Sequence, residues 1–490
     1  MNIKHIISIL PLLVASCTSI EEKPESHQVT SNFYRNASEA ESAVDAVYSG
    51  LVADGNENLV LYRGLFQVAI DESTDDYEAG PNASNSHVRA ISNVSFDPAN
   101  NRISLLWKET YDVINRANIA IDKIASISDE NISESLRLRL INEAKFLRAL
   151  NYFNLVRLFG EVPLILHETT SLSPENLYVE KSSEDVIYAQ IIQDLKDAES
   201  LPSPSDYSDV DKGRATSGSA KGLLAKVYLR KGEWASAAQK AKELIDLGWY
   251  GLFEDFADVF SLDHENGKEH LFSASCKGNA NYRGNIMGYR GATFEVPGIQ
   301  GNYTDMLHLA GGLYESFAKN DKRLPVTFVT EMISPTDGKL YQLSAPHFHK
   351  YYDETVVGNQ GQSSKDIPIL RFADVLLIYS EALNELNGPT KDAYQYIDQV
   401  RQRAGISLLA DIAPNLTKEQ FRDSVFQERR REFVYEQQRW YDLSRRGADY
   451  LVKTLHAAGK NNAEPKHVHF PIPLREIELN PNLKQNPDWE

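Results

Sequence analysis

The chain has 490 residues, of which 42% are hydrophobic and 10% aromatic, so it is long and apolar enough to bury a large core. Its formal net charge of −18 repels nucleic acid phosphates and anionic lipid surfaces, and it leaves neutral sugars and cationic ligands as compatible partners. With only two cysteines, the chain cannot rest on a framework of several disulfides.

The first residues have the build of a secretory leader. Lys4 precedes an apolar run over residues 6–15, which is shorter than the roughly 20 residues of a membrane span. The run ends in Val14-Ala15-Ser16-Cys17, which resembles the lipobox of bacterial lipoproteins. We therefore expect a signal peptide over residues 1–16 and a lipid on Cys17.

The segment after the leader is polar and acidic, and we expect a flexible tether over residues 17–31. Once Cys17 carries lipid, Cys276 has no disulfide partner and is expected to be a small buried residue. No later segment is apolar enough to span a bilayer. The prediction is a chain that is anchored to a membrane by lipid. The acidic residues after Cys17 resemble surface-export signals of some two-membrane bacteria, which favours the outer membrane, facing the cell surface.

Helical periodicity dominates the rest of the chain. The predicted helices cover residues 38–53, 99–124, 133–159, 183–199, 217–231, 234–247, 372–387, 390–403 and 418–445. Several form close pairs joined by short turns that contain Gly or Pro, which is typical of helical repeats.

One pair can be compared with the tetratricopeptide repeat position by position. The repeat requires a leucine, a small residue, an aromatic residue three positions later, a turn residue and an alanine on the second helix. These positions are filled by Leu224, Ala225, Tyr228, Gly232 and Ala237. The pattern predicts a mainly α fold on a tetratricopeptide-like scaffold.

Two stretches interrupt the helical pattern. Residues 277–314 contain eight glycines with tyrosines between them, and glycine at this density excludes a long helix. Residues 62–96 contain an acidic run over residues 71–77. Aromatic residues on irregular loops over a rigid scaffold are a common way to build a binding surface.

Several segments resemble the SusD/RagB family of outer-membrane nutrient-binding lipoproteins. They are EAKFLRALNYFNLVRLFGEVPL over residues 143–164, RFADVLLIYSEALN over 371–384, ERRREF over 428–433, QRWYDL over 438–443, FPIP over 470–473 and NPNLKQNP over 480–487. With the lipobox, they extend over nearly the whole mature chain in the family's order.

The resemblance implies a single α-helical domain over residues 32–490, with about four tetratricopeptide-like helix pairs. Its N-terminal part covers about residues 32–231, its C-terminal part about 232–490, and a ligand-loop insertion about 277–314. The resemblance also implies a partner, a TonB-dependent transporter of the SusC type, to which the lipoprotein delivers a captured glycan. Family members are not enzymes, and no cofactor is implied beyond the lipid on Cys17.

A sugar site needs a flat aromatic ring under the C–H face of the sugar and polar groups at its edge. The aromatic residues expected to contact the ligand are Tyr62, Tyr77, Tyr282, Tyr289 and Tyr303. The residues expected at the polar edge are Asp71, Asp75, Asp76, Arg283 and Arg290, with Asn82 and Asn302 as further candidates.

Other functions stay open. The same scaffold could bind peptides, which the anionic surface suits, or it could be an assembly adaptor without a small ligand. The acidic run could hold a calcium ion, although it lacks the spacing and the glycine of an EF-hand.

Several catalytic or binding chemistries find no support in the sequence. The histidine pairs at 347 and 349 and at 467 and 469 lack a third zinc ligand nearby and are expected at the surface or at an interface. The basic cluster over residues 429–431 is flanked by glutamates, so we expect ion pairs within its helix rather than phosphate binding. We find no nucleophile elbow and no P-loop.

Overall fold

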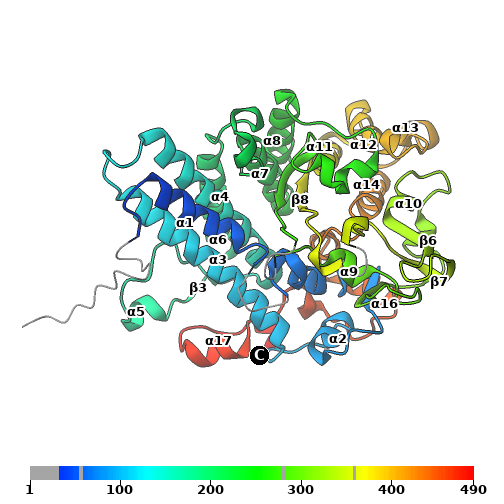
Figure 1. The fold of residues 1–490 in the computed structure, drawn as a ribbon, viewed down its shortest axis with the longest axis horizontal. Coiled ribbons are helices and arrows are strands. Elements are labelled where there is room, and N and C mark those ends of the chain that lie inside the picture. Colours follow the sequence, from blue (N-terminus) through cyan, green and yellow to red (C-terminus); the bar gives the residue numbers. More distant parts are fainter. Residues whose placement is uncertain (1–32, 54–58, 279–282, 357–359) are drawn as a thin grey trace, which may run out of the picture.

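The computed structural model of the protein describes residues 33–53, 59–278, 283–356 and 360–490 (Figure 1). The predicted leader, Cys17, the tether and Tyr282 lie outside the described residues. No helix in the described ranges combines the length and the apolar composition that a membrane span requires.

The described elements are mainly helical. The helices are α1 (Ala37–Ser49), α2 (Ser86–Ser92), α3 (Asn101–Ala125), α4 (Glu134–Phe159), α5 (Pro174–Leu177), α6 (Glu184–Ala198), α7 (Ser217–Lys231), α8 (Trp234–Leu247), α9 (Met287–Gly291), α10 (Leu324–Thr327), α11 (Phe372–Asn387), α12 (Lys391–Arg403), α13 (Leu409–Ile412), α14 (Lys418–Glu432), α15 (Arg439–Ser444), α16 (Ala448–Ala457) and α17 (Leu474–Leu479). The strands are β1 (Tyr77–Ala79), β2 (Val162–Pro163), β3 (Lys181–Ser182), β4 (His270–Ala274), β5 (Thr304–Met306), β6 (Phe328–Ile333), β7 (Leu340–Phe348) and β8 (Ile367–Arg371). The strands form antiparallel pairs, β1 with β5, β2 with β3, β4 with β8 and β6 with β7.

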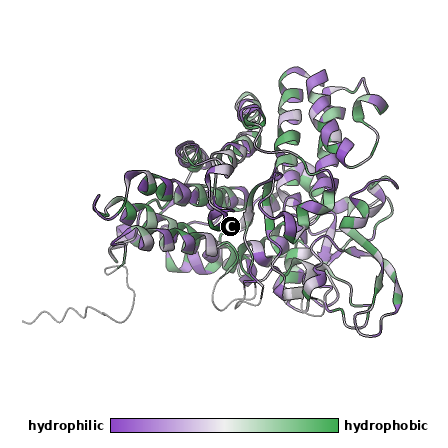
Figure 2. Cartoon of the chain, turned by 45° about the horizontal axis from the view of Figure 1, so that its top comes forward, coloured by the Kyte–Doolittle hydropathy of each residue, from purple (hydrophilic) through white to green (hydrophobic). Residues whose placement is uncertain are grey.

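The long helices pack in sequence order around one extended core. Helices α1, α3, α4 and α6 lie side by side at the left of Figure 1, and α7, α8, α11, α12 and α14 continue the array across the top. Green and purple alternate along these helices in Figure 2, as expected for helices with one buried and one solvent-facing side. The predicted mainly α class with tetratricopeptide-like helical repeats is confirmed.

Local sequence signals explain where these helices begin and end. The side chain of Asn100 accepts hydrogen bonds from the first backbone N–H groups of α3, and Ser133 does the same for α4. Thr216 and Ser219 form a reciprocal capping box at the start of α7. Helix α7 ends at Gly232, whose φ of 70° lies in the left-handed region that favours glycine.

The predicted helix pair over residues 217–247 is present as α7 and α8. Leu224 and Ala225 of α7 are fully buried, as is Ala237 of α8, and Tyr228 is largely buried. Small residues at the contact let the two helices approach closely, as the repeat pattern predicts.

The predicted helix over residues 418–445 is wrong in one respect, because it is broken in two. Helix α14 ends at Glu432 and α15 begins at Arg439, and both Tyr435 and Gln437 between them have left-handed backbones, with φ of 62° and 58°. The turn is held from outside, since the backbone N–H of Tyr435 donates to the hydroxyl of Tyr77 at 2.7 Å.

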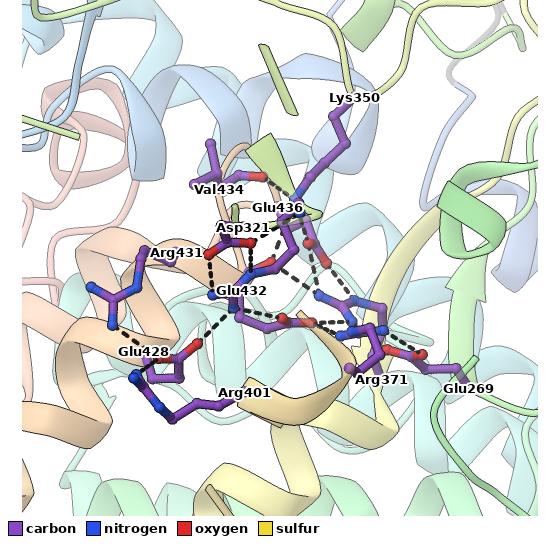
Figure 3. Close-up of polar contacts among 12 residues, drawn as sticks. Glu269, Asp321, Lys350, Arg371, Arg401, Glu428, Arg431, Glu432, Val434 and Glu436 are labelled. Carbon is purple, nitrogen blue, oxygen red and sulfur yellow. Dashed lines mark hydrogen bonds and ion pairs between the residues drawn. The ribbon is translucent and has the colours of Figure 1, made fainter. Parts of the chain in front are cut away.

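A network of buried charged side chains connects strand β8 with helix α14 and the turn that follows it (Figure 3). Arg371, at the end of β8, lies between three carboxylates and forms ion pairs with Glu269 at 2.6 Å, Glu432 at 2.9 Å and Glu436 at 2.7 Å. These side chains are almost completely buried, so each charge depends on its partners in place of water.

The basic cluster of α14 also pairs mainly outside its own helix, which corrects the sequence prediction. Arg429 forms ion pairs with Asp374 of α11 and with Asp442 of α15. Arg430 forms an ion pair with Asp76. Of the three arginines, Arg431 is the one that forms its ion pair within the helix, with Glu428 at 2.9 Å.

Candidate functional site

Two tyrosines of the glycine-rich segment form a pair at the surface. Tyr289 lies in α9 and Tyr303 directly precedes β5. Their ring centroids are 5.1 Å apart, their hydroxyls are 3.0 Å apart, and both side chains are half-buried. Burial, together with the hydrogen bond that the Tyr289 hydroxyl donates to the Tyr303 hydroxyl, raises the pKa of Tyr289 to about 12.

The tyrosine pair forms part of the wall of a cavity of about 530 Å³, which we call the tyrosine cavity. The described residues that line it are Leu59, Arg63, Ala83, Ser84, Asn85, Val88, Arg102, Ile286, Tyr289, Arg290, Gln300, Tyr303, Gly361 and Gln362. Ser84 and Gln300 are exposed, so the cavity opens to solvent. Its volume is within the range of small-molecule sites.

Glycines permit the close backbone contacts that shape this wall. A side chain at Gly301 would meet the carbonyl oxygens of Ala292 and Tyr289 at 2.5 and 2.6 Å. The backbone N–H of Tyr303 donates to the carbonyl of Arg290 at 2.8 Å, which closes the loop that presents both tyrosines. The glycine density noted in the sequence therefore serves close packing of the loop around the tyrosine pair.

Arg290 is a rigid part of the cavity wall. Its Nε donates to the side-chain oxygen of Gln67, and its Nη2 pairs with Glu72 at 2.5 Å and reaches Thr304 at 3.2 Å. Glu72 is fully buried behind the wall and does not line the cavity. Because its partners are buried, the guanidinium of Arg290 has one fixed position.

The acidic run does not contact the cavity, which corrects the prediction for its carboxylates. Asp75 forms a bidentate pair with Arg439 at 2.8 and 2.6 Å, and Asp76 pairs with Arg430. Asp71 is fully buried, and its Oδ2 accepts from the backbone N–H of Gln437 at 3.3 Å. Burial raises the pKa of Asp71 well above its ordinary value.

Two of the predicted aromatic contacts are also buried and are corrected. Tyr77 stacks on Phe348, with ring centroids 5.3 Å apart. Only 2% of the surface of Tyr77 is exposed. The hydroxyl of Tyr62 accepts a hydrogen bond from Asn154 at 2.9 Å inside the helical core. Both pack the scaffold on which the cavity is built.

The remaining predicted residues divide between two places. Tyr289, Arg290 and Tyr303 meet at the tyrosine cavity. Arg283 is exposed and lines a separate cavity of about 450 Å³, between α1 and residues 210–214. Asn82 is exposed and donates to the carbonyl of Gly301, whereas Asn302 is buried.

The carboxylates proposed for calcium have other partners. Glu72, Asp75 and Asp76 each pair with an arginine, which supplies the positive charge that a cation would bring. Within the described ranges, no three or more His, Cys, Asp and Glu side chains are arranged to hold a metal ion.

Two predictions for single side chains need correction. His347 and His467 were expected at the surface or at an interface, yet both are buried within the chain, each 3% exposed. The Nε2 atom of His347 lies 3.1 Å from a Glu295 carboxylate oxygen, so this ring joins β7 to the glycine-rich segment. Cys276 is half-buried rather than fully buried, and burial raises the pKa of its thiol well above the ordinary value.

Sequence reasoning missed several residues of the wall. Arg102 lies inside the predicted helix over residues 99–124, Arg63 lies in the stretch over residues 62–96 that was predicted to be non-helical, and Asn85 caps the unpredicted helix α2. A local signal existed for Asn85, since an Asn before Ser86 is a typical helix N-cap. No local pattern could show that Arg102, at the start of α3, lines the same cavity as Tyr289 and Tyr303.

Comparison with known proteins supports a single family assignment. Residues 20–229 match a family model described as starch-binding associating with outer membrane, and residues 335–489 match the SusD family model. The chain is 28% identical to the SusD-like protein P25 of Formosa agariphila, over 99% of this chain and 98% of that protein.

Solved structures agree. A SusD homolog from Bacteroides thetaiotaomicron superimposes with a TM-score of 0.79 at 26% identity, covering 94% of this chain and 98% of that one. A laminarin-binding SusD-like protein gives a TM-score of 0.75 at 26% identity, covering 93% of this chain and all of the other. Fold, motifs and comparisons together show that the chain belongs to the SusD-like family.

Proposed function

We propose that this protein captures a glycan in the tyrosine cavity and passes it, chemically unchanged, to a TonB-dependent transporter of the SusC type. The observation that carries the proposal is the pair of half-buried tyrosines on the wall of a cavity of about 530 Å³. The matching family description, starch-binding associating with outer membrane, supports a glycan as the ligand class.

The chemistry of the wall suits a sugar ring. The faces of Tyr289 and Tyr303 offer an apolar surface for the C–H groups of a pyranose ring. Asn85, Gln300 and Gln362 bring amide groups, which can both donate to and accept from sugar hydroxyls. Of the polar residues predicted for the edge of the site, only Arg290 lines this cavity, and the three amides were not predicted.

Binding without reaction agrees with the charges around the cavity. Glycoside hydrolysis by the usual mechanism needs a pair of carboxyl groups on either side of the scissile bond. No Asp or Glu is among the described residues that line the tyrosine cavity. The acidic side chains of residues 71–76 are buried in ion pairs or in the core instead.

The proposal includes the position of the protein in the cell. A lipid on Cys17 would anchor the chain at the outer membrane, and the polar tether would let the domain lie over the transporter at the cell surface. The family description associates its members with the outer membrane, which supports this arrangement.

Calorimetric titration of the mature lipid-bearing chain, in a polyoxyethylene detergent that contains no sugar, tests the proposal. The panel contains neutral polysaccharides, acidic polysaccharides and mixed peptides. We expect heat with a glycan, and we expect the double variant Tyr289→Ala/Tyr303→Ala to bind it at least about 10-fold more weakly, because both ring faces are lost.

The matched control is Tyr379→Ala/Tyr396→Ala. These tyrosines also form a half-buried pair, with centroids 4.6 Å apart, but lie on α11 and α12 away from the cavity wall. Equal affinity of the two double variants would contradict the assigned site. Heat with peptides alone would replace the glycan by a peptide as the ligand class.

A further inference from the structure

The residues that directly follow the two cavity tyrosines are joined behind the wall. Arg290 follows Tyr289, and Thr304 follows Tyr303. The Nη2 atom of Arg290 and the hydroxyl of Thr304 both donate to one atom, the Oε1 oxygen of Glu72, at 2.5 Å each. A single carboxylate oxygen therefore links the two ends of the loop that presents the tyrosine pair.

Gln67 completes a closed set of four side chains with Glu72, Arg290 and Thr304, which we call the buried clamp. The Oε1 atom of Gln67 accepts a hydrogen bond from the Nε of Arg290, and its Nε2 donates to the hydroxyl of Thr304 at 2.5 Å. Gln67, Glu72 and Thr304 are completely buried, and only 6% of Arg290 is exposed. Water therefore has little access to compete for these hydrogen bonds.

The donors and acceptors of the buried clamp match one another. The Thr304 hydroxyl has a single hydrogen, which it donates to Glu72, and its oxygen accepts the N–H of Gln67. The amide of Gln67 uses both of its ends, since its oxygen accepts from Arg290. Such a buried network is rigid, and the loss of one member leaves other buried groups without a partner.

The buried clamp also fixes the loop to the scaffold. The backbone N–H of Tyr303 donates to the carbonyl of Arg290 at 2.8 Å, which joins the ends of the loop to each other. Gln67 and Glu72 lie outside the loop, in the segment before β1. Gln67, Glu72 and Thr304 are not among the described residues that line the tyrosine cavity, so they act on a ligand there through the residues that they hold.

We propose that the buried clamp positions the tyrosine pair for glycan binding. Its three members outside the wall, Gln67, Glu72 and Thr304, are positioning residues that set the separation and tilt of the two tyrosine rings. This inference rests on the proposed function. The rings lie with their centroids 5.1 Å apart and their planes at 33°, so they form one angled surface. A sugar that contacts both rings loses contact when either one moves, because stacking depends on distance and orientation.

Thr304→Val tests the proposal, because valine keeps the shape of threonine and removes the hydroxyl that contacts Glu72 and Gln67. Calorimetric titration of the mature lipid-bearing chain uses the glycan that gives the largest heat with the wild type. We expect Thr304→Val to bind this glycan about 5-fold more weakly, since a displaced ring loses part of its contact with the sugar. Thr304→Ser retains the hydroxyl and should restore the wild-type affinity.

Oxidative cross-linking measures the geometry of the tyrosine pair without glycan. Light-driven oxidation with a ruthenium complex and persulfate couples tyrosine rings that lie side by side, and mass spectrometry measures the yield of the cross-link between Tyr289 and Tyr303. We expect a lower yield in Thr304→Val than in the wild type, and the wild-type yield in Thr304→Ser. A loss of stability alone would change neither this yield nor the affinity of the folded protein.

Two further variants separate positioning from a general effect on folding. Thr110→Val is the matched control, because Thr110 is also buried and its hydroxyl donates to the carbonyl of Leu106 within α3. Thr110 is not among the described residues that line the tyrosine cavity, so affinity and cross-link yield should stay at the wild-type values. Gln67→Met breaks the buried clamp at another member and should weaken binding as Thr304→Val does. Circular dichroism checks that each variant is folded.

The outcomes separate this inference from the proposed function. Wild-type affinity in both Thr304→Val and Gln67→Met overturns the inference but leaves glycan capture standing. A loss of affinity that Thr110→Val shares, or that Thr304→Ser does not restore, has the same meaning, and so does weaker binding with an unchanged cross-link yield. An absence of heat with every glycan in the wild type itself overturns the proposed function and the inference with it.

Discussion

At the residue scale, Glu428 shows how this protein stabilises charge in its interior. The carboxylate is completely buried on α14 and pairs with Arg323 at 2.7 Å, Arg401 at 2.8 Å and Arg431 at 2.9 Å. Burial alone would raise the pKa of Glu428, but the three guanidinium groups outweigh it and lower the pKa to about 2.

This environment predicts a pH-dependent stability. A carboxylate with a lowered pKa in the folded state stabilises the protein above its unfolded pKa of 4.5, and this contribution is lost as the pH falls toward 2. Glu428→Gln should lower the free energy of unfolding at pH 7 by about 3 kcal/mol, because Arg323, Arg401 and Arg431 lose a charged partner. By pH 3.5 the difference from the wild type should shrink by about 1 kcal/mol.

Urea unfolding followed by circular dichroism at pH 7 and pH 3.5 measures both quantities. Glu419→Gln is the control, since Glu419 is an exposed residue of the same helix. A destabilisation by Glu428→Gln that stays constant with pH would show that the carboxylate is not held ionised by its arginines.

Ion pairs between distant parts of the chain also explain why some residues were wrongly predicted to contact the ligand. Asp75 and Asp76 look like a solvated acidic loop because their partners, Arg439 and Arg430, lie more than 350 residues further along the chain. Local composition cannot reveal a partner at that distance. Tyr289 and Tyr303, which were predicted to contact the ligand from one glycine-rich segment, pair with each other and line the cavity.

At the element scale, helix boundaries follow local signals wherever a cap or a glycine sets them. Helices α4 and α7 begin and end close to the predicted positions because Ser133, Thr216 and Gly232 act on adjacent backbone. The break between α14 and α15 was missed because the left-handed Tyr435 and Gln437 are held by distant groups. The pairing of β1 with β5 was also not predicted, because the two strands are far apart in the sequence.

The turn between α7 and α8 offers a test of this local control. Gly232 has φ of 70°, so Gly232→Ala places a side chain in the left-handed region and should lower the free energy of unfolding by about 1 kcal/mol. Gly251→Ala is the control, because an added Cβ there meets no atom within 4 Å and its backbone is not left-handed. Thermal melts of both variants measure the effect, and equal melting temperatures would contradict the assigned role of Gly232.

At the scale of the whole molecule, the wall of the tyrosine cavity combines residues of the two regions that match the family models with residues of the segment between them. The two family models match residues 20–229 and 335–489, whereas Ile286, Tyr289, Arg290, Gln300 and Tyr303 lie in the segment between them. The shared motifs allowed the fold and the family to be predicted from the sequence. The two tyrosines of the cavity wall lie in a segment without such motifs, and the wall forms only when this segment packs against residues 59–102 and 361–362.

Hydrogen–deuterium exchange of the mature chain shows whether glycan binds in the tyrosine cavity. The ligand is the glycan that gives the largest heat in the titrations. We expect slower exchange on glycan addition in residues 83–88 and 286–303, which contribute to the cavity wall. Protection confined to other cavities, such as the one between α1 and residues 210–214, would contradict it.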